Sequence, residues 1–97
     1  MKRQCERCKY IAQDVSIEVP SDLTRIIRVT TEALENGIIE NITENEDSYT
    51  PFEGLSETGP WDDILNYRFR CRHCGARYEL FCDTYHGGGK WGQSNHA

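Results

Sequence analysis

The sequence contains no Lys or Arg between Val29 and Tyr67, and it contains no long run of apolar residues. The stretch without basic residues is acidic and holds Glu32, Glu35, Glu40, Glu44, Glu46, Asp47, Glu53, Glu57, Asp62 and Asp63. The whole chain has a net charge of -5 and a pI near 5.1, whereas domains dedicated to nucleic-acid binding are basic. This balance favours a basic partner over a phosphate backbone.

The apolar segments are too short to span a membrane, and hydrophobic residues make up 37 % of the chain. Residues 1–5 lead into no apolar segment of the kind that a secretory signal requires, so we expect a cytoplasmic protein. In a reducing compartment, paired cysteines serve more often as metal ligands or catalytic thiols than as disulfides. The five cysteines are also an odd number, which argues against a complete set of disulfides.

Four of the five cysteines form two Cys-x-x-Cys pairs, Cys5 with Cys8 and Cys71 with Cys74. Each pair presents two thiolates from one tight turn, and four thiolates complete the tetrahedral shell of a Zn²⁺ ion. We therefore expect one structural zinc ion with Cys5, Cys8, Cys71 and Cys74 as its ligands. Such a shell has no open position for catalysis.

Other uses of these side chains stay open at this point. Either pair could be a dithiol redox site, but such a site begins a helix in a βαβ unit, whereas Cys71 follows a strand-like segment. His73 could replace a cysteine as a ligand, although we expect its side chain to point away from the sulfurs. Cys82 alternates with Tyr78 and Leu80, which indicates a small buried apolar side chain, with a spare ligand or a reactive thiol as alternatives.

Residue patterns predict an α+β fold with one amphipathic helix and a small antiparallel sheet. Apolar residues alternate with polar ones over 15–19, which predicts a strand. A helix is expected over 22–35, with Ser21 as its N-cap and Asn36-Gly37 as its stop. A second short strand is expected at 38–42.

The second half of the chain is expected to form a hairpin around the second cysteine pair. After an acidic loop at 43–60, the alternation returns over 64–71 and again over 78–82. The triple glycine at 87–89 is expected to end the last strand, with a flexible tail at 92–97. The chain has 97 residues, enough for a single zinc-binding domain over 1–97.

The residue after the second cysteine of a Cys-x-x-Cys turn often needs a positive φ, which Gly75 provides at little cost. The segment 69–80 resembles the second knuckle and hairpin of zinc-ribbon proteins. The segment 4–10 is similar to a first knuckle, with Lys9 where Gly is common. The resemblance implies zinc-ribbon-like knuckles joined by one zinc ion. The chain departs from a compact ribbon in its long insertion, residues 9–70, which carries the expected helix and the acidic loop.

Basic residues are concentrated in segments 1–11 and 67–97, where they outnumber acidic residues nine to three. A zinc ion that joins these segments would give the protein one basic pole and one acidic body. Aromatic and polar residues lie among the basic ones. The candidate binding residues are Arg68, Arg70, Arg72, Arg77, Tyr85, His86, Lys90 and Trp91. The run 87–90 has neither the spacing nor the following helix of a phosphate-binding loop.

These features lead to three expectations for function. The first is a non-catalytic, zinc-stabilised binding module that docks on a partner protein, in the manner of acidic inhibitors and immunity-type proteins. The second is a nucleic-acid-binding zinc ribbon in transcription or RNA processing, because arginines interleaved with aromatic residues suit single strands. The third, an enzyme, has the least support because four cysteine ligands leave zinc no open position.

Overall fold

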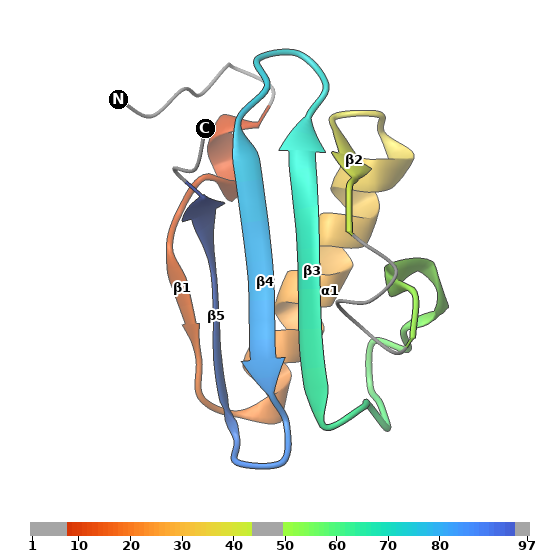
Figure 1. Cartoon of the computed structure of the whole chain (residues 1–97), viewed down its shortest axis with the longest axis vertical. Coiled ribbons are helices and arrows are strands. Elements are labelled where there is room, and N and C mark those ends of the chain that lie inside the picture. Colours follow the sequence, from red (N-terminus) through yellow and green to blue (C-terminus); the bar gives the residue numbers. More distant parts are fainter. Residues whose placement is uncertain (1–7, 44–49, 95–97) are drawn as a thin grey trace.

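The computed structural model describes residues 8–43 and 50–94, which form a five-stranded sheet with one helix packed on a face of it (Figure 1). The elements in chain order are the 3₁₀ turn η1 (Lys9–Ile11), β1 (Val15–Ile17), α1 (Pro20–Glu35), β2 (Ile39–Asn41), the 3₁₀ turn η2 (Phe52–Gly54), β3 (Ile64–Cys71), β4 (Arg77–Asp83) and β5 (Gly88–Ser94). The strand order is β1-β5-β4-β3-β2, and all neighbours are antiparallel. This confirms the predicted α+β class with one helix and an antiparallel sheet.

One stripe of α1 is buried against the sheet, as the apolar spacing predicts. The buried residues recur every three or four positions and are Leu23, Ile26, Ile27, Thr30 and Ala33. In Figure 1 the helix lies behind β3 and β4. The helix ends where the sequence predicts, because the Gly37 N–H donates to the Leu34 carbonyl at 3.1 Å and the Ile38 N–H to the Ala33 carbonyl at 2.9 Å.

The start of α1 differs from the prediction that Ser21 is the N-cap. The helix begins at Pro20, whose missing N–H costs nothing at the first helical position, and Val19 occupies the N-cap. The Asp22 carboxylate accepts hydrogen bonds from the backbone N–H groups of Glu18, at 3.0 Å, and Val19, at 3.3 Å. These bonds lower the pKa of Asp22. The acid in the first turn thus bonds back to the N-cap residue and to the residue before it, as the acidic residue of a capping box does.

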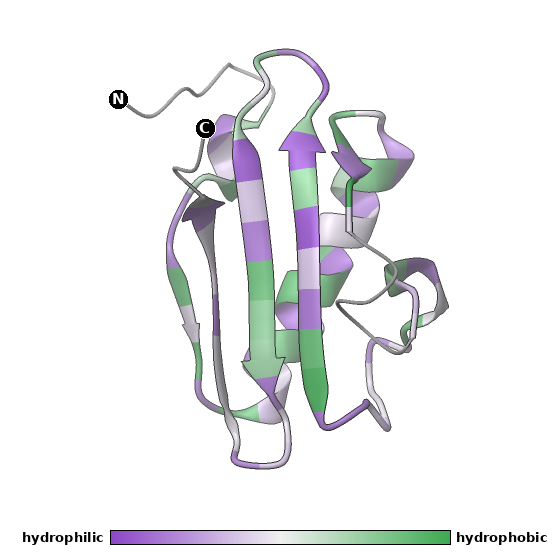
Figure 2. Ribbon diagram, viewed as in Figure 1, coloured by the Kyte–Doolittle hydropathy of each residue, from purple (hydrophilic) through white to green (hydrophobic). Residues whose placement is uncertain are grey.

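Strands β3 and β4 alternate between a buried and an exposed face over most of their length. Figure 2 shows the accompanying alternation of hydrophobic and hydrophilic residues most clearly along the upper part of β3. The buried side chains are Leu65, Tyr67, Phe69 and Cys71 of β3 and Tyr78, Leu80 and Cys82 of β4. The hairpin register pairs Tyr67 with Leu80 and Phe69 with Tyr78, so one face of the hairpin packs under α1. No described element covers the opposite face, which we call the open face (Figure 1).

The prediction of a flexible tail from Gly92 is wrong for its first three residues. Positions 92–94 belong to β5 and pair with β4. The triple glycine does not end the sheet. It leads into β5. Position 89 requires glycine, because a Cβ there would lie only 2.6 Å from the Cys82 Cα on the neighbouring strand. Trp91 is 3 % exposed and anchors β5 in the core.

The described part of the acidic loop packs on the sheet and on α1. Phe52 of η2 is buried, with its ring edge-to-face at 5.3 Å from Tyr67 and 5.1 Å from Phe69. The Thr24 hydroxyl donates to the Glu57 carbonyl at 2.6 Å. Residues 50–60 are therefore part of the folded body. Within residues 8–43 and 50–94, no helix combines the length and the apolar character needed to cross a membrane.

Candidate metal centre

The turn between β3 and β4, residues 71–75, carries the second cysteine pair, and we call it the knuckle turn after the resemblance of its sequence. The Cys71 N–H donates to the Ala76 carbonyl at 2.7 Å, and the Gly75 N–H donates to the Cys71 carbonyl at 3.1 Å. The backbone N–H of His73 points at the Cys71 sulfur, 3.4 Å away. Gly75 has a φ of 80°, a left-handed conformation that glycine adopts at little cost. The turn thus confirms the role predicted for Gly75.

The third sulfur comes from a distant part of the chain. Cys8 directly precedes η1, and its backbone carbonyl accepts the first hydrogen bond of that turn, from the Ile11 N–H at 3.0 Å. The indole N–H of Trp91 donates to the Ile11 carbonyl at 2.8 Å, which fixes η1 against β5. On the other side, the Arg72 N–H donates to the Ile38 carbonyl at 2.9 Å, so the knuckle turn is also tied to the segment after α1.

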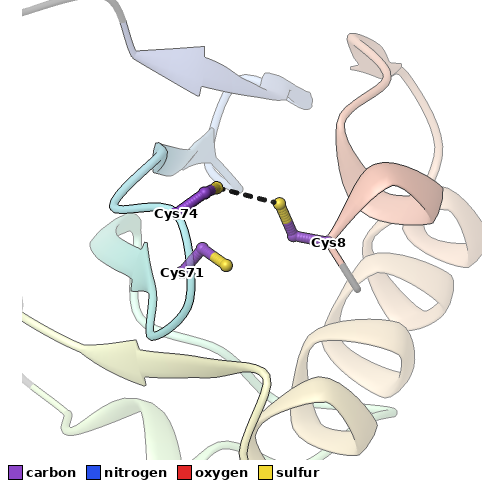
Figure 3. Close-up of side chains that lie close together, drawn as sticks. All are labelled: Cys8, Cys71 and Cys74. Atoms are coloured by element: carbon purple, nitrogen blue, oxygen red, sulfur yellow. Dashed lines mark hydrogen bonds between the residues drawn. The ribbon is translucent and has the colours of Figure 1, made fainter. Parts of the chain in front are cut away.

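These contacts bring Cys8, Cys71 and Cys74 into one cluster (Figure 3). Their sulfur atoms all lie within 4.8 Å of one another, and Cys8 and Cys74 are 3.6 Å apart. A Zn–S bond of about 2.3 Å in tetrahedral geometry places neighbouring sulfurs about 3.8 Å apart, so the cluster fits a thiolate-bound ion. The fourth predicted ligand, Cys5, lies outside the described residues. The structure therefore brings together the three predicted ligands that it describes.

A tyrosine hydroxyl also reaches the cluster, which the sequence analysis did not foresee. The Tyr78 O–H donates to the Cys8 sulfur at 3.1 Å, and the Tyr78 side chain is completely buried. Burial, followed by the contact with Cys8, raises the pKa of Tyr78 far above its usual value, so the hydroxyl stays protonated and donates. The Trp91 ring stacks on Tyr78 with centroids 5.7 Å apart, which fixes the position of that hydroxyl. Alternation alone places Tyr78 inward, but no sequence signal pairs it with Cys8.

The alternative thiol and imidazole interpretations find no support in the described residues. His73 is exposed and is not part of the cluster. Cys82 is 3 % exposed on the helix-covered face, as predicted for a buried apolar side chain, and burial raises the pKa of its thiol. Cys71 ends a strand of an antiparallel sheet and does not begin a helix, unlike the first cysteine of a thioredoxin-type site.

Four of the candidate binding residues project from the open face, and two of them already form ion pairs. The Arg70 Nε lies 2.8 Å from a Glu40 carboxylate oxygen, and the Arg68 Nε lies 3.9 Å from one of Glu79. The other two basic residues of this face are Arg77 and Lys90. Because half of its cations have acidic neighbours, the open face is less basic than the sequence implies.

The remaining candidates lie apart from the open face. Arg72 is exposed in the knuckle turn. Tyr85 and His86 are exposed in the turn between β4 and β5, where the His86 Nδ1 lies 2.7 Å from the Asp83 carboxylate. Trp91 was expected at a binding surface, but it is a core residue because the inward face of β5 packs against Tyr78. The structure does not bring these residues into one site.

Comparisons of the chain with protein-family models, with curated proteins and with solved structures find no match. What the centre can do chemically is therefore argued from its own atoms. Three sulfurs, two of them fully buried, converge from both ends of the described chain, and a buried hydroxyl donates to one of them. Thiolate sulfur is a soft ligand and selects zinc, cuprous or iron ions over magnesium or calcium.

Proposed function

We propose that this protein is a non-catalytic binding module, held in shape by one zinc ion, which docks on a partner protein through its acidic side. The proposal is carried by the buried sulfur cluster, because a centre made only of cysteines is typical of structural zinc. Cys5 is the proposed fourth ligand, three residues before Cys8. The ion would join η1 to the knuckle turn, and the surface of the folded domain would carry the function.

The local environment suits a permanently bound ion. The Tyr78 hydroxyl and the His73 backbone N–H each point at a sulfur and would stabilise thiolate charge. Cys8 and Cys71 are fully buried, so water has little access to their sulfurs. A shell of four cysteines has no position for a substrate, which is why we propose no enzymatic activity.

The docking side is proposed from the distribution of acidic side chains. Among the described residues, several exposed acids of the Lys/Arg-free stretch have no cationic partner, and they are Glu32, Glu35, Glu53 and Asp63. Glu32 and Glu35 belong to α1, Glu53 belongs to η2, and Asp63 directly precedes β3. A basic partner would gain long-range attraction from such a surface, with an association rate that falls as salt rises.

Capture of basic proteins by the immobilised, zinc-loaded protein tests this function. We expect capture at low ionic strength, and we expect it to be lost in the triple variant Glu32→Gln, Glu35→Gln, Asp63→Asn. A matched control with the same change in charge, Asp14→Asn, Glu18→Gln and Glu79→Gln, lies outside the acidic stretch and should retain capture. Equal capture by both triple variants, or none by the unmodified protein, would refute the proposed docking side.

A second candidate function is binding of single-stranded nucleic acid on the open face. It is favoured by one observation: Phe81 is 38 % exposed on that face and lies between Lys90 of β5 and Asn66 of β3 in the sheet register. An exposed ring beside cations is a stacking platform for a base. The discriminating measurement is the salt-dependent binding of a single-stranded RNA, which Phe81→Ala would weaken if this candidate is correct.

A further inference from the structure

The cysteine cluster has one partly exposed residue beside two buried ones. Cys74 is partly exposed, whereas Cys8 and Cys71 are fully buried. The Cys74 sulfur lies 3.6 Å from the Cys8 sulfur, and the dashed line in Figure 3 joins these two atoms. An oxidant that enters from solvent therefore reaches Cys74 more readily than the two buried cysteines, and the Cys8 sulfur is close enough to react next.

We propose that Cys74 and Cys8 form a site of thiol oxidation at which a peroxide replaces the metal ion by a disulfide between η1 and the knuckle turn. This inference rests on the metal-joined centre proposed above. The Cys74 thiolate sulfur attacks one peroxide oxygen, the O–O bond breaks, hydroxide leaves and a sulfenic acid forms. The Cys8 thiolate then attacks the Cys74 sulfur, the S–O bond breaks and a second hydroxide leaves. Two thiolates are oxidised to one disulfide, and one hydrogen peroxide is reduced to two hydroxides.

The contacts around the cluster favour this pair over the pair within the knuckle turn. Cys71 is the last residue of β3, and its backbone N–H and carbonyl are both engaged in the turn. Its sulfur accepts the N–H of His73. A bond between Cys71 and Cys74 would have to rearrange this turn. Cys8 and Cys74 lie on separate segments, and their sulfurs need to approach by about 1.6 Å to reach a bond length of about 2.0 Å.

The consequence is specific to this pairing. A disulfide within the knuckle turn would leave η1 without a bond to that turn once the metal ion has departed, held only by contacts such as the one from Trp91 to the Ile11 carbonyl. A disulfide between Cys8 and Cys74 keeps η1 on the sheet, because it joins the same two segments as the ion does. The oxidised protein would therefore keep its fold after losing its metal, and reduction would restore the thiolates.

The chain itself offers a clean assay, because cleavage after Lys and Arg places every cysteine in a different peptide. The five peptides are 4–7, 8–9, 71–72, 73–77 and 78–90. The protein, once loaded with zinc and once stripped by a chelator, is treated with hydrogen peroxide, blocked with an alkylating reagent, cleaved and analysed by mass spectrometry. Released zinc is followed with a chromophoric chelator.

We expect the linked peptide 8–9 plus 73–77, with release of one zinc per cross-link from the loaded protein. The link should disappear in Cys8→Ser and Cys74→Ser and persist in Cys82→Ser, the matched control. A link between 71–72 and 73–77, a link to 4–7, or oxidation without any link would overturn the inference. Cross-linking in a protein that never binds zinc would support the Cys8–Cys74 site and refute the proposed metal. Zinc binding without the Cys8–Cys74 link would support the proposed metal and refute the oxidation site.

Discussion

The two tight turns at opposite ends of β4 have the same backbone conformation at their glycines but differ in what holds them. Gly75 of the knuckle turn has a φ of 80°, and Gly87 of the β4–β5 turn has a φ of 81°. In the β4–β5 turn, residues 83–87, the His86 Nδ1 and the His86 backbone N–H both contact the Asp83 carboxylate, at 2.7 Å and 3.0 Å. This turn has a further bond within the β3–β4 hairpin, from the Thr84 N–H to the Asp63 carbonyl at 2.8 Å.

The knuckle turn depends instead on segments far away in the sequence. Its sulfurs meet Cys8, and its Arg72 N–H bonds to the Ile38 carbonyl. The contacts of the β4–β5 turn need only the β3–β4 hairpin, whereas the knuckle turn is complete only when η1 is also in place. Loss of the metal ion should therefore act first on the end of the sheet that carries the knuckle turn.

Metal removal is expected to have the largest effect. Structural zinc contributes about 10 kcal/mol or more to folding in small zinc domains, whereas a domain is stable by about 5–15 kcal/mol in all. Chelation, or the substitution Cys74→Ser, should therefore unfold the protein or lower its melting temperature strongly, as measured by circular dichroism with metal analysis. Cys82→Ser is the control that keeps the metal. An unchanged melting curve after complete chelation would show that the cluster is not a structural metal site.

The next largest effect is expected for the hydroxyl that donates to Cys8. Tyr78→Phe should lower zinc affinity by about 10–100-fold, as loss of an outer hydrogen bond to a ligand commonly does. Tyr67→Phe is the matched control, because Tyr67 is equally buried but donates to the Thr50 carbonyl. In each variant the tyrosine loses a hydrogen bond from its hydroxyl, worth about 1 kcal/mol of stability.

A cobalt-substituted protein separates the two tyrosine effects. Only Tyr78→Phe should shift the sulfur-to-cobalt charge-transfer band, because only its hydroxyl touches a ligand sulfur. If the band is the same in both variants, the bond from Tyr78 to Cys8 has no influence on the metal.

The two glycines give a direct comparison of the turns. A Cβ at Gly75 or at Gly87 would meet no atom within 4 Å, so Gly75→Ala and Gly87→Ala differ only in location. Each should lower the free energy of unfolding by about 1–2 kcal/mol through left-handed strain. Gly75→Ala should also change the cobalt spectrum, whereas Gly87→Ala should not. A spectral change in both, or in neither, would contradict the distinction between the turns.

The smallest expected effect is a pH dependence of stability that arises from Asp83 in the β4–β5 turn. Hydrogen bonds from the backbone and side chain of His86 lower the pKa of Asp83 in the folded protein. Its contribution to stability is therefore present above the ordinary Asp pKa of about 3.9 and is lost as the pH falls through the lower folded value. At low pH, protonation of the cysteine thiolates would release a bound zinc ion equally from Asp83→Asn and from the unmodified protein. The difference in melting temperature between these two proteins therefore isolates the effect of Asp83. That difference should shrink below about pH 4, and a constant difference would contradict it.

The sequence predicted the parts of the fold that follow from local periodicity. The alternation over 64–71 and 78–82 predicted β3 and β4, and the apolar spacing after Pro20 predicted α1 almost to its ends. The place of Gly75 after the second cysteine predicted the left-handed residue of the knuckle turn. In each case the residues that carry the signal are also the residues that make the structure.

The features that the sequence did not predict depend on contacts between residues that are distant in the sequence. β5 was not predicted, because glycines usually interrupt strands. The requirement for a residue without a side chain at position 89 comes from the close approach of the Cys82 backbone, which the sequence does not show. Trp91 is buried because its ring stacks on Tyr78 of the neighbouring strand and its indole N–H donates to the Ile11 carbonyl. The bond from Tyr78 to Cys8 likewise joins two positions that no local pattern relates. For the candidate site, the cysteine spacing identified the cluster but not the hydroxyl that supports it.

The strand order has a consequence for how the chain acquires its structure during synthesis. Among the described strands, β1 pairs only with β5, with Val15 opposite Trp91. A ribosome that has made β1, α1 and β2 has therefore not yet provided the edge on which β1 docks. Contacts between segments this far apart slow folding, because a long stretch of chain must be ordered before they form. The first described strand should be among the last to become protected from hydrogen exchange, although it is the first to leave the exit tunnel.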